Sequence, residues 1–330
     1  MKRNIALIAG GDSGEYAISI NSAKVIGQSM DADKYDVFLI VISHSKWVYL
    51  NDMGVESNVD KNDFSVIHNG IKVNFDCALI TIHGTPGEDG KLQGYLDLLA
   101  IPYTTSGVLG CAVTFNKYFC KALVSIAGVQ VARSEKFYKH EQISIHDLLS
   151  RVSLPVFVKP NKGGSSLGTS FVKEADGLLA AIRNCFEHDD EALIEEYIEG
   201  TELTCGVYSR KGEIIVLPVT EIVSKTAATF FDYEAKYTKG AAEEITPARV
   251  DDLVYRNVQE TTRLLYKKLE LKGVCRIDYI YGIKGLFFLE ANITPGMSQQ
   301  SIVPQQAAYM GISMRQMFDE IITEAINTRL

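Results

Sequence analysis

The chain has 330 residues, enough for two or three domains that each bury a core. Hydrophobic residues make up 46% and charged residues 22%, the balance of a globular protein without disordered or repetitive tracts. The net charge is −8 and no basic block occurs, which argues against a nucleic-acid surface or an anchor on an anionic membrane.

The amino-terminal third is predicted to begin with a βαβ unit. Its elements are a strand at 4–9, a turn at 10–14, a helix at 17–30 and a strand at 35–42. A further apolar strand at 77–82 runs into the loop 83–90, and the leucines of 92–99 have helical spacing. Because loops after such strands commonly carry function, the loop 83–90 is a candidate site.

The middle of the chain is predicted to be a compact α+β unit, with a boundary near 103–110. The predicted elements are a helix pair at 108–127, a strand at 155–160, a glycine-serine loop at 161–169, a strand at 170–172 and a helix at 175–186. The loop joins its two strands as a hairpin would.

The last third is predicted to contain several strands and one long helix. The strands are expected at 193–197, 202–208, 214–219, 273–281 and 286–291, and the helix at 251–269. The segment 220–247 shows little regular pattern. A loop of that length in a compact domain is usually functional, so we interpret it as a lid.

Oxygen-bearing side chains recur on the last two predicted strands. Asp278 lies on one strand, and Glu290 and Asn292 lie on the next, so the two strands could direct oxygen ligands toward one point. Magnesium takes one or two carboxylates and fills its other positions with water and phosphate oxygens. The three residues are therefore a candidate magnesium site, with solvated acids at strand ends as the alternative.

Phosphate binding is suggested by Lys159 and the loop that follows it. Lys159 ends a buried strand directly before Pro160, which favours a phosphate-binding cation over a surface lysine, with a lysine at the edge of the core as the alternative. The glycines of 163–168 would let backbone amides approach a triphosphate, although a hairpin without a ligand would have a similar sequence. The loop matches neither the P-loop nor the dinucleotide-binding pattern.

The cysteines and the apolar runs indicate a soluble cytoplasmic protein. The six cysteines occur singly, without the close pairs of zinc or redox motifs, so we interpret them as reduced and buried. No stretch approaches the roughly 18 apolar residues of a membrane span, so no membrane insertion is expected.

A series of short motifs along the chain resembles the motifs of one known protein family. The motifs are His83-Gly84-Thr85 through Gly87-Glu88-Asp89-Gly90, Gln93-Gly94, Ile101-Pro102-Tyr103, Ser106-Gly107-Val108, Val158-Lys159-Pro160, Gly164-Ser165-Ser166, Tyr233-Glu234-Ala235-Lys236-Tyr237, Arg276-Ile277-Asp278, Glu290-Ala291-Asn292 and Pro295-Gly296-Met297. In this order, over nearly the whole chain, they resemble the D-alanine–D-alanine ligases of the ATP-grasp superfamily.

The resemblance implies a fold of α/β and α+β class with three domains. Residues 1–105 would form a Rossmann-like substrate domain that precedes the ATP-grasp fold. Residues 106–197 would form the central ATP-grasp subdomain with the glycine-serine phosphate loop. Residues 198–330 would form the second subdomain, with the lid 220–247 and the metal site.

The resemblance also assigns a nucleotide and metal site. Lys117 and Lys159 would contact the phosphates of ATP, with Ser165, Ser166 and Lys236 close to them. The adenine and ribose would be lined by Glu195, Glu196, Ile198 and Glu202, where Glu196 replaces a lysine that relatives often carry. Asp278, Glu290 and Asn292 would hold two Mg²⁺ ions, for which Mn²⁺ could substitute.

Substrate and catalytic roles follow in the same way. Glu15 would receive the ammonium of the first D-alanine, with His83 near it, and Ser165 and Tyr237 would join Glu15 in a hydrogen-bonded latch. Arg276 and the Gly296 amide would stabilise oxyanion charge, and Ser301 would bind the carboxylate of the second substrate. The simpler alternatives are an acid at a helix N-terminus for Glu15, a structural hydrogen bond for His83, and an ion pair with Asp278 for Arg276. For Ser165, Lys236, Tyr237 and Ser301 the alternative is an ordinary polar residue on the surface.

The expected activity is ATP-dependent ligation of two D-alanines through D-alanyl phosphate, for peptidoglycan synthesis. The small-molecule partners would be D-alanine and ATP, and relatives suggest a homodimer built through the amino-terminal domain. The substrate motifs argue against another ATP-grasp ligase, and the intact Arg276, Asp278, Glu290 and Asn292 argue against a catalytically silent nucleotide-binding regulator. Tyr237 favours an amine over a hydroxy acid as second substrate.

Overall fold

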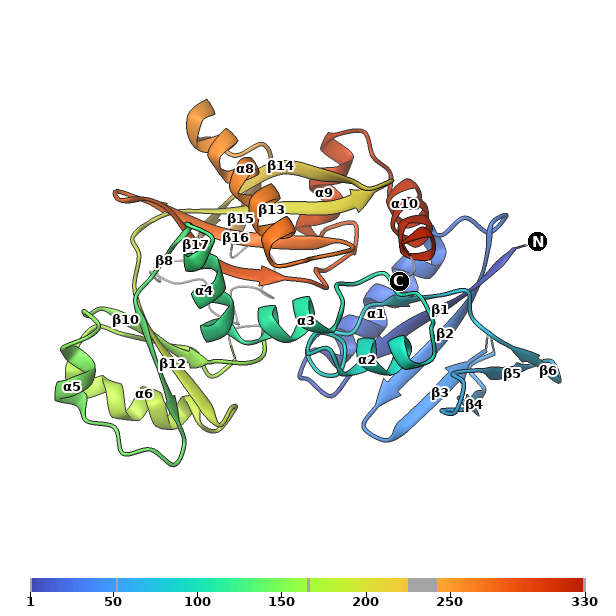
Figure 1. The fold of residues 1–330 in the computed structure, drawn as a ribbon, viewed down its shortest axis with the longest axis horizontal. Helices are drawn as coiled ribbons and strands as arrows, with labels where there is room; N and C mark the ends of the chain where they lie inside the picture. The colour runs from blue at the N-terminus through green and yellow to red at the C-terminus, as the bar shows by residue number, and fades with distance from the viewer. Residues whose placement is uncertain (1, 52, 165–166, 225–241, 329–330) are drawn as a thin grey trace.

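The computed structural model describes residues 2–51, 53–164, 167–224 and 242–328 (Figure 1). Within these residues the strands form three larger sheets and one two-stranded sheet. No helix within them is long and apolar enough to cross a bilayer.

The first sheet contains the predicted βαβ unit. Its order is β4-β3-β2-β1-β7, with β1 (Arg3–Gly10), β2 (Tyr35–Ser43), β3 (Lys46–Leu50), β4 (Glu56–Asn58) and β7 (Cys77–Ile80). β1 runs parallel to β2 and β7, as predicted, whereas β3 and β4 add antiparallel strands that the sequence pattern did not reveal. A hairpin of β5 (Val66–His68) and β6 (Ile71–Val73) lies outside it.

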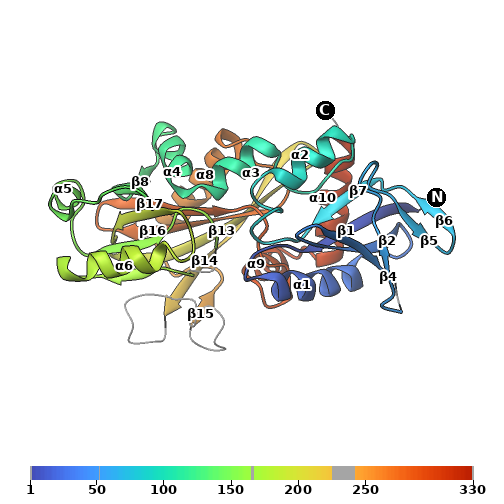
Figure 2. The ribbon, with the colours of Figure 1, turned by 90° about the horizontal axis from the view of Figure 1, so that it is seen from below.

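Helices cover both faces of this sheet. α1 (Tyr16–Ser29) lies on one face and α2 (Lys91–Leu98) on the other (Figure 2). Alternate residues of β1 point to opposite faces, so Leu7 packs on the α1 side and Ile8 on the α2 side. The apolar run of β1 is therefore explained by burial on two faces.

The central sheet is antiparallel. Its order is β11-β10-β12-β9, with β9 (Ser134–Tyr138), β10 (Val156–Pro160), β11 (Ser170–Val172) and β12 (Glu191–Glu196). Val156 pairs with Val172, which confirms the predicted hairpin across the glycine-serine loop. α5 (Ile145–Leu149), the 3₁₀ turn η1 (Ala175–Gly177) and α6 (Leu178–Cys185) complete this part of the chain.

The two faces of the central sheet differ in chemistry. Val156 and Val158 of β10, with Ile194 of β12, pack into a core with α6. Lys159 and Glu195 alternate with these residues and therefore project from the other face. Sequence alternation thus gives this sheet an apolar face and a second face, here called the charged face, on which Lys159 and Glu195 lie beside Phe157.

The largest sheet has the order β15-β14-β13-β16-β17-β8. The bounds are β8 (Gln130–Val131), β13 (Gly200–Arg210), β14 (Glu213–Ser224), β15 (Ala242–Ile245), β16 (Cys275–Gly282) and β17 (Gly285–Asn292). The helices α3 (Val108–Phe115), α4 (Lys117–Ile126) and α8 (Asp252–Lys268) flank it. Val258 of α8 packs with Ile277 and Ala291, so Asp278 and Glu290 project from the opposite face.

One prediction about this sheet is wrong. The segment 220–247 was expected to lack regular structure, but β14 continues to Ser224 and β15 pairs with it, with Glu221 opposite Ile245. A short edge strand whose partner lies about two dozen residues away has no local signal, because its hydrogen bonds are long-range. The middle of the proposed lid, 225–241, lies outside the described residues.

The carboxy-terminal helices join the first and the largest sheets. α9 (Ile302–Tyr309) and α10 (Met314–Asn327) were not predicted. Phe318 of α10 shares one core with Leu79 of the first sheet and Leu217 of the largest. Asp319 accepts a hydrogen bond from Tyr35 at 2.8 Å, and Glu320 accepts one from Tyr208 at 2.7 Å. α10 therefore fixes the two sheets to each other (Figure 1).

Candidate active site

The turn after β1 lies against the glycine-serine loop of the central sheet. A Cβ atom on Gly164 would lie 3.3 Å from Glu15 Oε2, so the Glu15 carboxylate and this loop are close neighbours. Ser13 fixes the turn, since its hydroxyl donates to the His83 carbonyl at 2.7 Å and accepts from the Glu15 amide at 3.2 Å. Glu15, the His83 loop and the glycine-serine loop are thus brought together from three parts of the sequence.

The loop after β7 carries a buried carboxylate. Glu88 accepts hydrogen bonds from the Gly84 amide at 2.7 Å and from the Thr294 hydroxyl at 2.6 Å. Burial raises the pKa of Glu88, and nearby His83 opposes that shift. Glu88 therefore connects the first sheet to the segment after β17.

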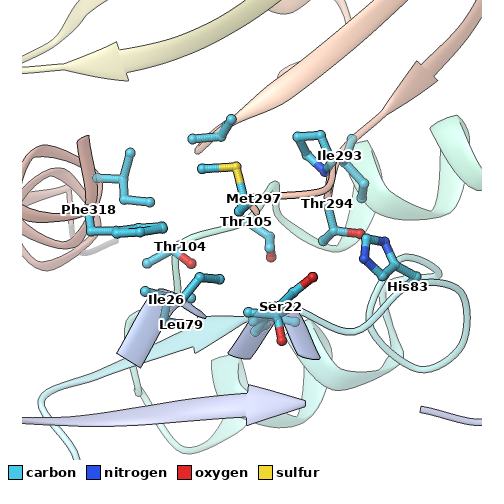
Figure 3. Close-up of a pocket in the computed structure, with 15 residues that line it drawn as sticks. Ser22, Ile26, Leu79, His83, Thr104, Thr105, Ile293, Thr294, Met297 and Phe318 are labelled. Carbon is cyan, nitrogen blue, oxygen red and sulfur yellow. The ribbon is translucent and has the colours of Figure 1, made fainter. Parts of the chain in front are cut away.

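Behind this loop lies a mainly apolar pocket (Figure 3). His83 and Thr294 lie at one end of it, and Phe318 of α10 lies at the other. Ile26 of α1 and Met297 also line it. His83 is buried and its ring faces the Thr294 side chain, so it is positioned by both the first and the largest sheet.

The start of α4 is tied to the glycine-serine loop. Lys117 Nζ donates to the Gly163 carbonyl at 2.5 Å, and Asn116 caps the helix by accepting from the Phe119 amide. Asn161, which is fully buried, accepts from the Tyr118 amide at 2.9 Å. Lys117 therefore stands next to the loop that the sequence predicts to bind phosphate.

Lys159 lies in a buried cluster of charges. Its Nζ donates to Glu195 Oε1 at 2.9 Å, and Lys121 of α4 donates to the other carboxylate oxygen. Burial alone would raise the pKa of Glu195, but the two ammonium groups outweigh it and lower that pKa to about 2. The Glu195 carboxylate, predicted to lie near adenine and ribose, is thus ionised and bound to two lysines.

The other predicted adenine and ribose residues lie where the chain passes from β12 of the central sheet to β13 of the largest sheet. Glu196 projects from the apolar side of β12, where its carboxylate accepts from the Ser153 amide at 2.8 Å. Ile198 is half-buried in the link between β12 and β13, and Glu202 lies on β13. Glu196 could therefore meet a nucleotide on the charged face only through its backbone.

The candidate metal ligands lie opposite one another on β16 and β17. Asp278 pairs with Glu290 and Arg276 pairs with Asn292 in the antiparallel register, which places all four on one face. The side-chain oxygens of Asp278, Glu290 and Asn292 are the hard donors that magnesium prefers, so these three residues fit the cation. Among the described residues no three histidine, cysteine, aspartate or glutamate side chains gather as a metal site, so the candidate set depends on the Asn292 amide as well as on two carboxylates.

Arg276 is paired with Asp278. The guanidinium donates two hydrogen bonds to the carboxylate, at 2.9 and 2.8 Å, and Thr204 also donates to it. Burial alone would lower the pKa of Arg276, but the Asp278 carboxylate outweighs it and raises that pKa. This is the ion pair that the sequence left open as an alternative, and it keeps a fixed positive charge beside the candidate metal ligands.

Gly296 and Ser301 are close neighbours after β17. A Cβ atom on Gly296 would lie 2.9 Å from Ser301 Oγ, so only glycine fits without a shift. The Ser301 hydroxyl accepts from the Ser298 amide at 3.2 Å and lies 2.8 Å from the Ser298 hydroxyl. Ser301 also precedes α9, whose positive helix end favours an anion nearby.

Four predicted site residues lie outside the described residues. They are Ser165, Ser166, Lys236 and Tyr237. Their roles stay predictions.

Sequence reasoning assigned no role to Lys121 and named Glu88 only as part of a motif. Lys121 follows Lys117 by four residues on α4, and it lies beside buried Cys120 and Val124. A lysine on the apolar side of a helix is a signal for a buried ion pair. Glu88 offered no comparable pattern, because its partner Thr294 is 206 residues away.

Comparison with known proteins identifies the family. The model of the D-ala D-ala ligase N-terminus matches residues 4–106, and that of the C-terminus matches residues 121–323. The chain belongs to the D-alanine–D-alanine ligase family. A curated family member from Parabacteroides distasonis, named D-alanine--D-alanine ligase, is 43% identical over 330 residues, which is 100% of this chain and 99% of that protein.

Solved structures of ligases have the same fold. The VanG D-Ala:D-Ser ligase from Enterococcus faecalis superposes with a TM-score of 0.86 and 32% identity, covering 98% of this chain and 99% of that one. The Bacillus anthracis D-alanine–D-alanine ligase complexed with ATP gives 0.78 and 27%, covering 99% and 98%. The predicted fold class, a Rossmann-like domain followed by an ATP-grasp fold, is confirmed.

Proposed function

We propose that this chain joins two D-alanine molecules to D-alanyl-D-alanine at the expense of ATP, for peptidoglycan synthesis. The relatives' names and the ATP bound to one structural neighbour support the reaction class. The observation that carries the proposal is the proximity of the Glu15 carboxylate to the glycine-serine loop at Gly164. It puts a group suited to an amino acid's ammonium beside a loop suited to phosphates.

The proposed reaction has two steps. A carboxylate is a poor electrophile, so the first D-alanine carboxylate attacks the γ-phosphorus of ATP, which forms D-alanyl phosphate and releases ADP. The amine of the second D-alanine then attacks the acyl carbon, and phosphate leaves. Lys117 and Lys159 would neutralise charge on the phosphates during the first step.

The negative charge that develops on the acyl oxygen during the second step also needs stabilisation. In the proposed second step, Arg276 and the Gly296 amide would face the oxyanion. The ion pair with Asp278 supports this role for Arg276, because it holds the guanidinium in one orientation. Ser301, close to Gly296, would bind the carboxylate of the second D-alanine.

Magnesium, with manganese as a substitute, would be held by Asp278, Glu290 and Asn292. When bound, it would neutralise phosphate charge and orient the terminal phosphate. The hard oxygen donors and the shared sheet face support this assignment. We propose two ions, as the resemblance implies.

The remaining expectations also stay proposals. The chain would divide into domains at 1–105, 106–197 and 198–330, and 220–247 would carry the lid that excludes water from the acyl phosphate. The protein would act in the cytoplasm as a homodimer. All six cysteines are buried free thiols, which supports a reducing compartment.

A coupled assay tests the proposal. Purified protein with ATP, Mg²⁺ and D-alanine should release ADP and phosphate, and mass spectrometry should detect D-alanyl-D-alanine. Omission of D-alanine is the control for background ATP hydrolysis. A product that contains D-serine or D-lactate, in preference to D-alanine when all three compete at neutral pH, would contradict the substrate assignment.

A further inference from the structure

Two lysines from different elements share one buried carboxylate. Lys121 of α4 binds one oxygen of Glu195 and also donates to Ser134 Oγ at 3.1 Å, and Lys159 of β10 binds the other oxygen. The side chains of Lys121 and Glu195 are each 4% exposed, whereas that of Lys159 is 17% exposed. Lys159 is therefore the member of this cluster that a ligand could reach.

The charges in this cluster do not cancel. Burial lowers the pKa of the Lys121 ammonium, and the Glu195 carboxylate opposes that shift. With both lysines protonated, one carboxylate faces two ammonium groups, which leaves one net positive charge in a largely buried site. Uncompensated buried charge is costly, so the site favours the arrival of an anion. A nucleotide phosphate next to Lys159 would supply that anion.

We propose that Lys121 is a positioning residue for phosphate binding, because it occupies Glu195 and so prevents that carboxylate from fully neutralising Lys159. Lys121 itself lies behind Glu195 and against Ser134, and it would not touch the nucleotide. This inference rests on the proposed function, since it assumes that Lys159 faces the phosphates of ATP.

Removal of the Lys121 charge tests the idea. In Lys121→Met, Glu195 keeps Lys159 as its single ammonium partner, and the two charges cancel. We expect the Kd of Mg·ADP, measured by isothermal titration calorimetry, to rise about tenfold, which corresponds to about 1.4 kcal/mol. The Kd of adenosine, which lacks phosphate, should change less than about twofold. Lys121→Arg keeps the charge and should stay close to the wild type.

A double variant separates positioning from direct contact. In Lys121→Met/Glu195→Gln the carboxylate is gone as well, so Lys159 regains its free positive charge. We expect the ratio of the adenosine Kd to the Mg·ADP Kd to return toward the wild-type value. If Lys121 bound the phosphates directly, the double variant would stay as weak as the single one, and the inference would be wrong.

Val156→Ala controls for simple destabilisation. Val156 lies on the apolar face of the same strand as Lys159 and is fully buried, so this variant loosens the central sheet without touching the charges. It should lower the melting temperature but keep the wild-type Kd ratio. Equal weakening of Mg·ADP and adenosine in Lys121→Met would show a merely structural role and overturn the inference. Wild-type protein that binds no Mg·ADP would overturn the proposed function itself.

Discussion

The Thr294 hydroxyl donates a 2.6 Å hydrogen bond to Glu88 Oε1 and joins the loop after β7 to the segment after β17. The other carboxylate oxygen accepts from the Gly84 amide of its own loop. One buried carboxylate thus receives donors from the segments that follow β7 and β17, and the candidate site residues His83 and Gly296 lie on these two segments.

Loss of this hydrogen bond should weaken the folded state. Thr294→Val keeps the shape of the side chain but removes the donor, so the free energy of unfolding should fall by about 1–2 kcal/mol. Urea unfolding followed by circular dichroism would measure it. Thr294→Ser retains the hydroxyl and is the matched control. Equal losses in both variants would mean that the methyl group, and not the hydrogen bond, matters.

The Glu88 carboxyl should make stability depend on pH. Burial raises its pKa above the ordinary 4.5, so the folded state holds this proton more tightly than the unfolded state. Its contribution to stability is therefore complete below about pH 4.5 and is lost as the pH rises through the folded-state pKa. Glu88→Gln cannot lose a proton, so the unfolding free energy of the variant relative to the wild type should increase from pH 4 to pH 8. A constant difference over that range would contradict the predicted direction.

Asn292 should influence the metal requirement more than stability. Its Oδ1 accepts from the Thr294 amide at 3.1 Å, a single local contact. Asn292→Ala should therefore raise the Mg²⁺ concentration for half-maximal ADP release about tenfold, with a small change in melting temperature. Asn257→Ala, on the exposed surface of α8, is the control and should leave the Mg²⁺ titration unchanged. An unchanged titration in Asn292→Ala would remove this residue from the proposed ligand set.

Gly273, two residues before β16 begins, should tolerate no side chain. Its φ is +63°, and a Cβ atom there would overlap the carbonyl oxygen of Thr104. Gly273→Ala should lower the unfolding free energy by roughly 3 kcal/mol or more, because backbone must move. Gly212→Ala has a similar φ of +76° but no atom within 4 Å, so it isolates the conformational cost, about 1 kcal/mol. Similar losses in the two variants would argue against the clash.

Local pattern was enough for the elements whose partners are near in sequence. The βαβ unit, the hairpin across the glycine-serine loop and the long α8 helix were all predicted, because periodicity and turn residues lie within a few dozen residues. β15, α9 and α10 were missed. β8 consists of two residues whose partner β17 lies more than 150 residues further on, so no local signal exists for it.

The contacts in the candidate site were likewise predictable only where the partners lie near each other in sequence. Asp278 and Glu290 lie on two strands of one hairpin, so their proximity could be inferred from the residues between them. The approach of Glu15 to Gly164 and the sharing of Glu195 by Lys121 and Lys159 depend on how three separate sheets and α4 are assembled. Motif resemblance pointed to Glu15 and Lys159, but it did not indicate that Lys121 and Lys159 bind the same carboxylate.

The core that joins α10 to the first sheet has a consequence for synthesis on the ribosome. Leu7 and Leu79 emerge early, but Phe318, with which they share that core, is translated more than 200 residues after them. Until Phe318 has been translated, one face of the nascent first sheet exposes apolar surface. The central sheet, in contrast, has a core of its own and can fold as it leaves the exit tunnel. Chaperone protection during translation should therefore be needed most at the face of the first sheet that α10 later covers.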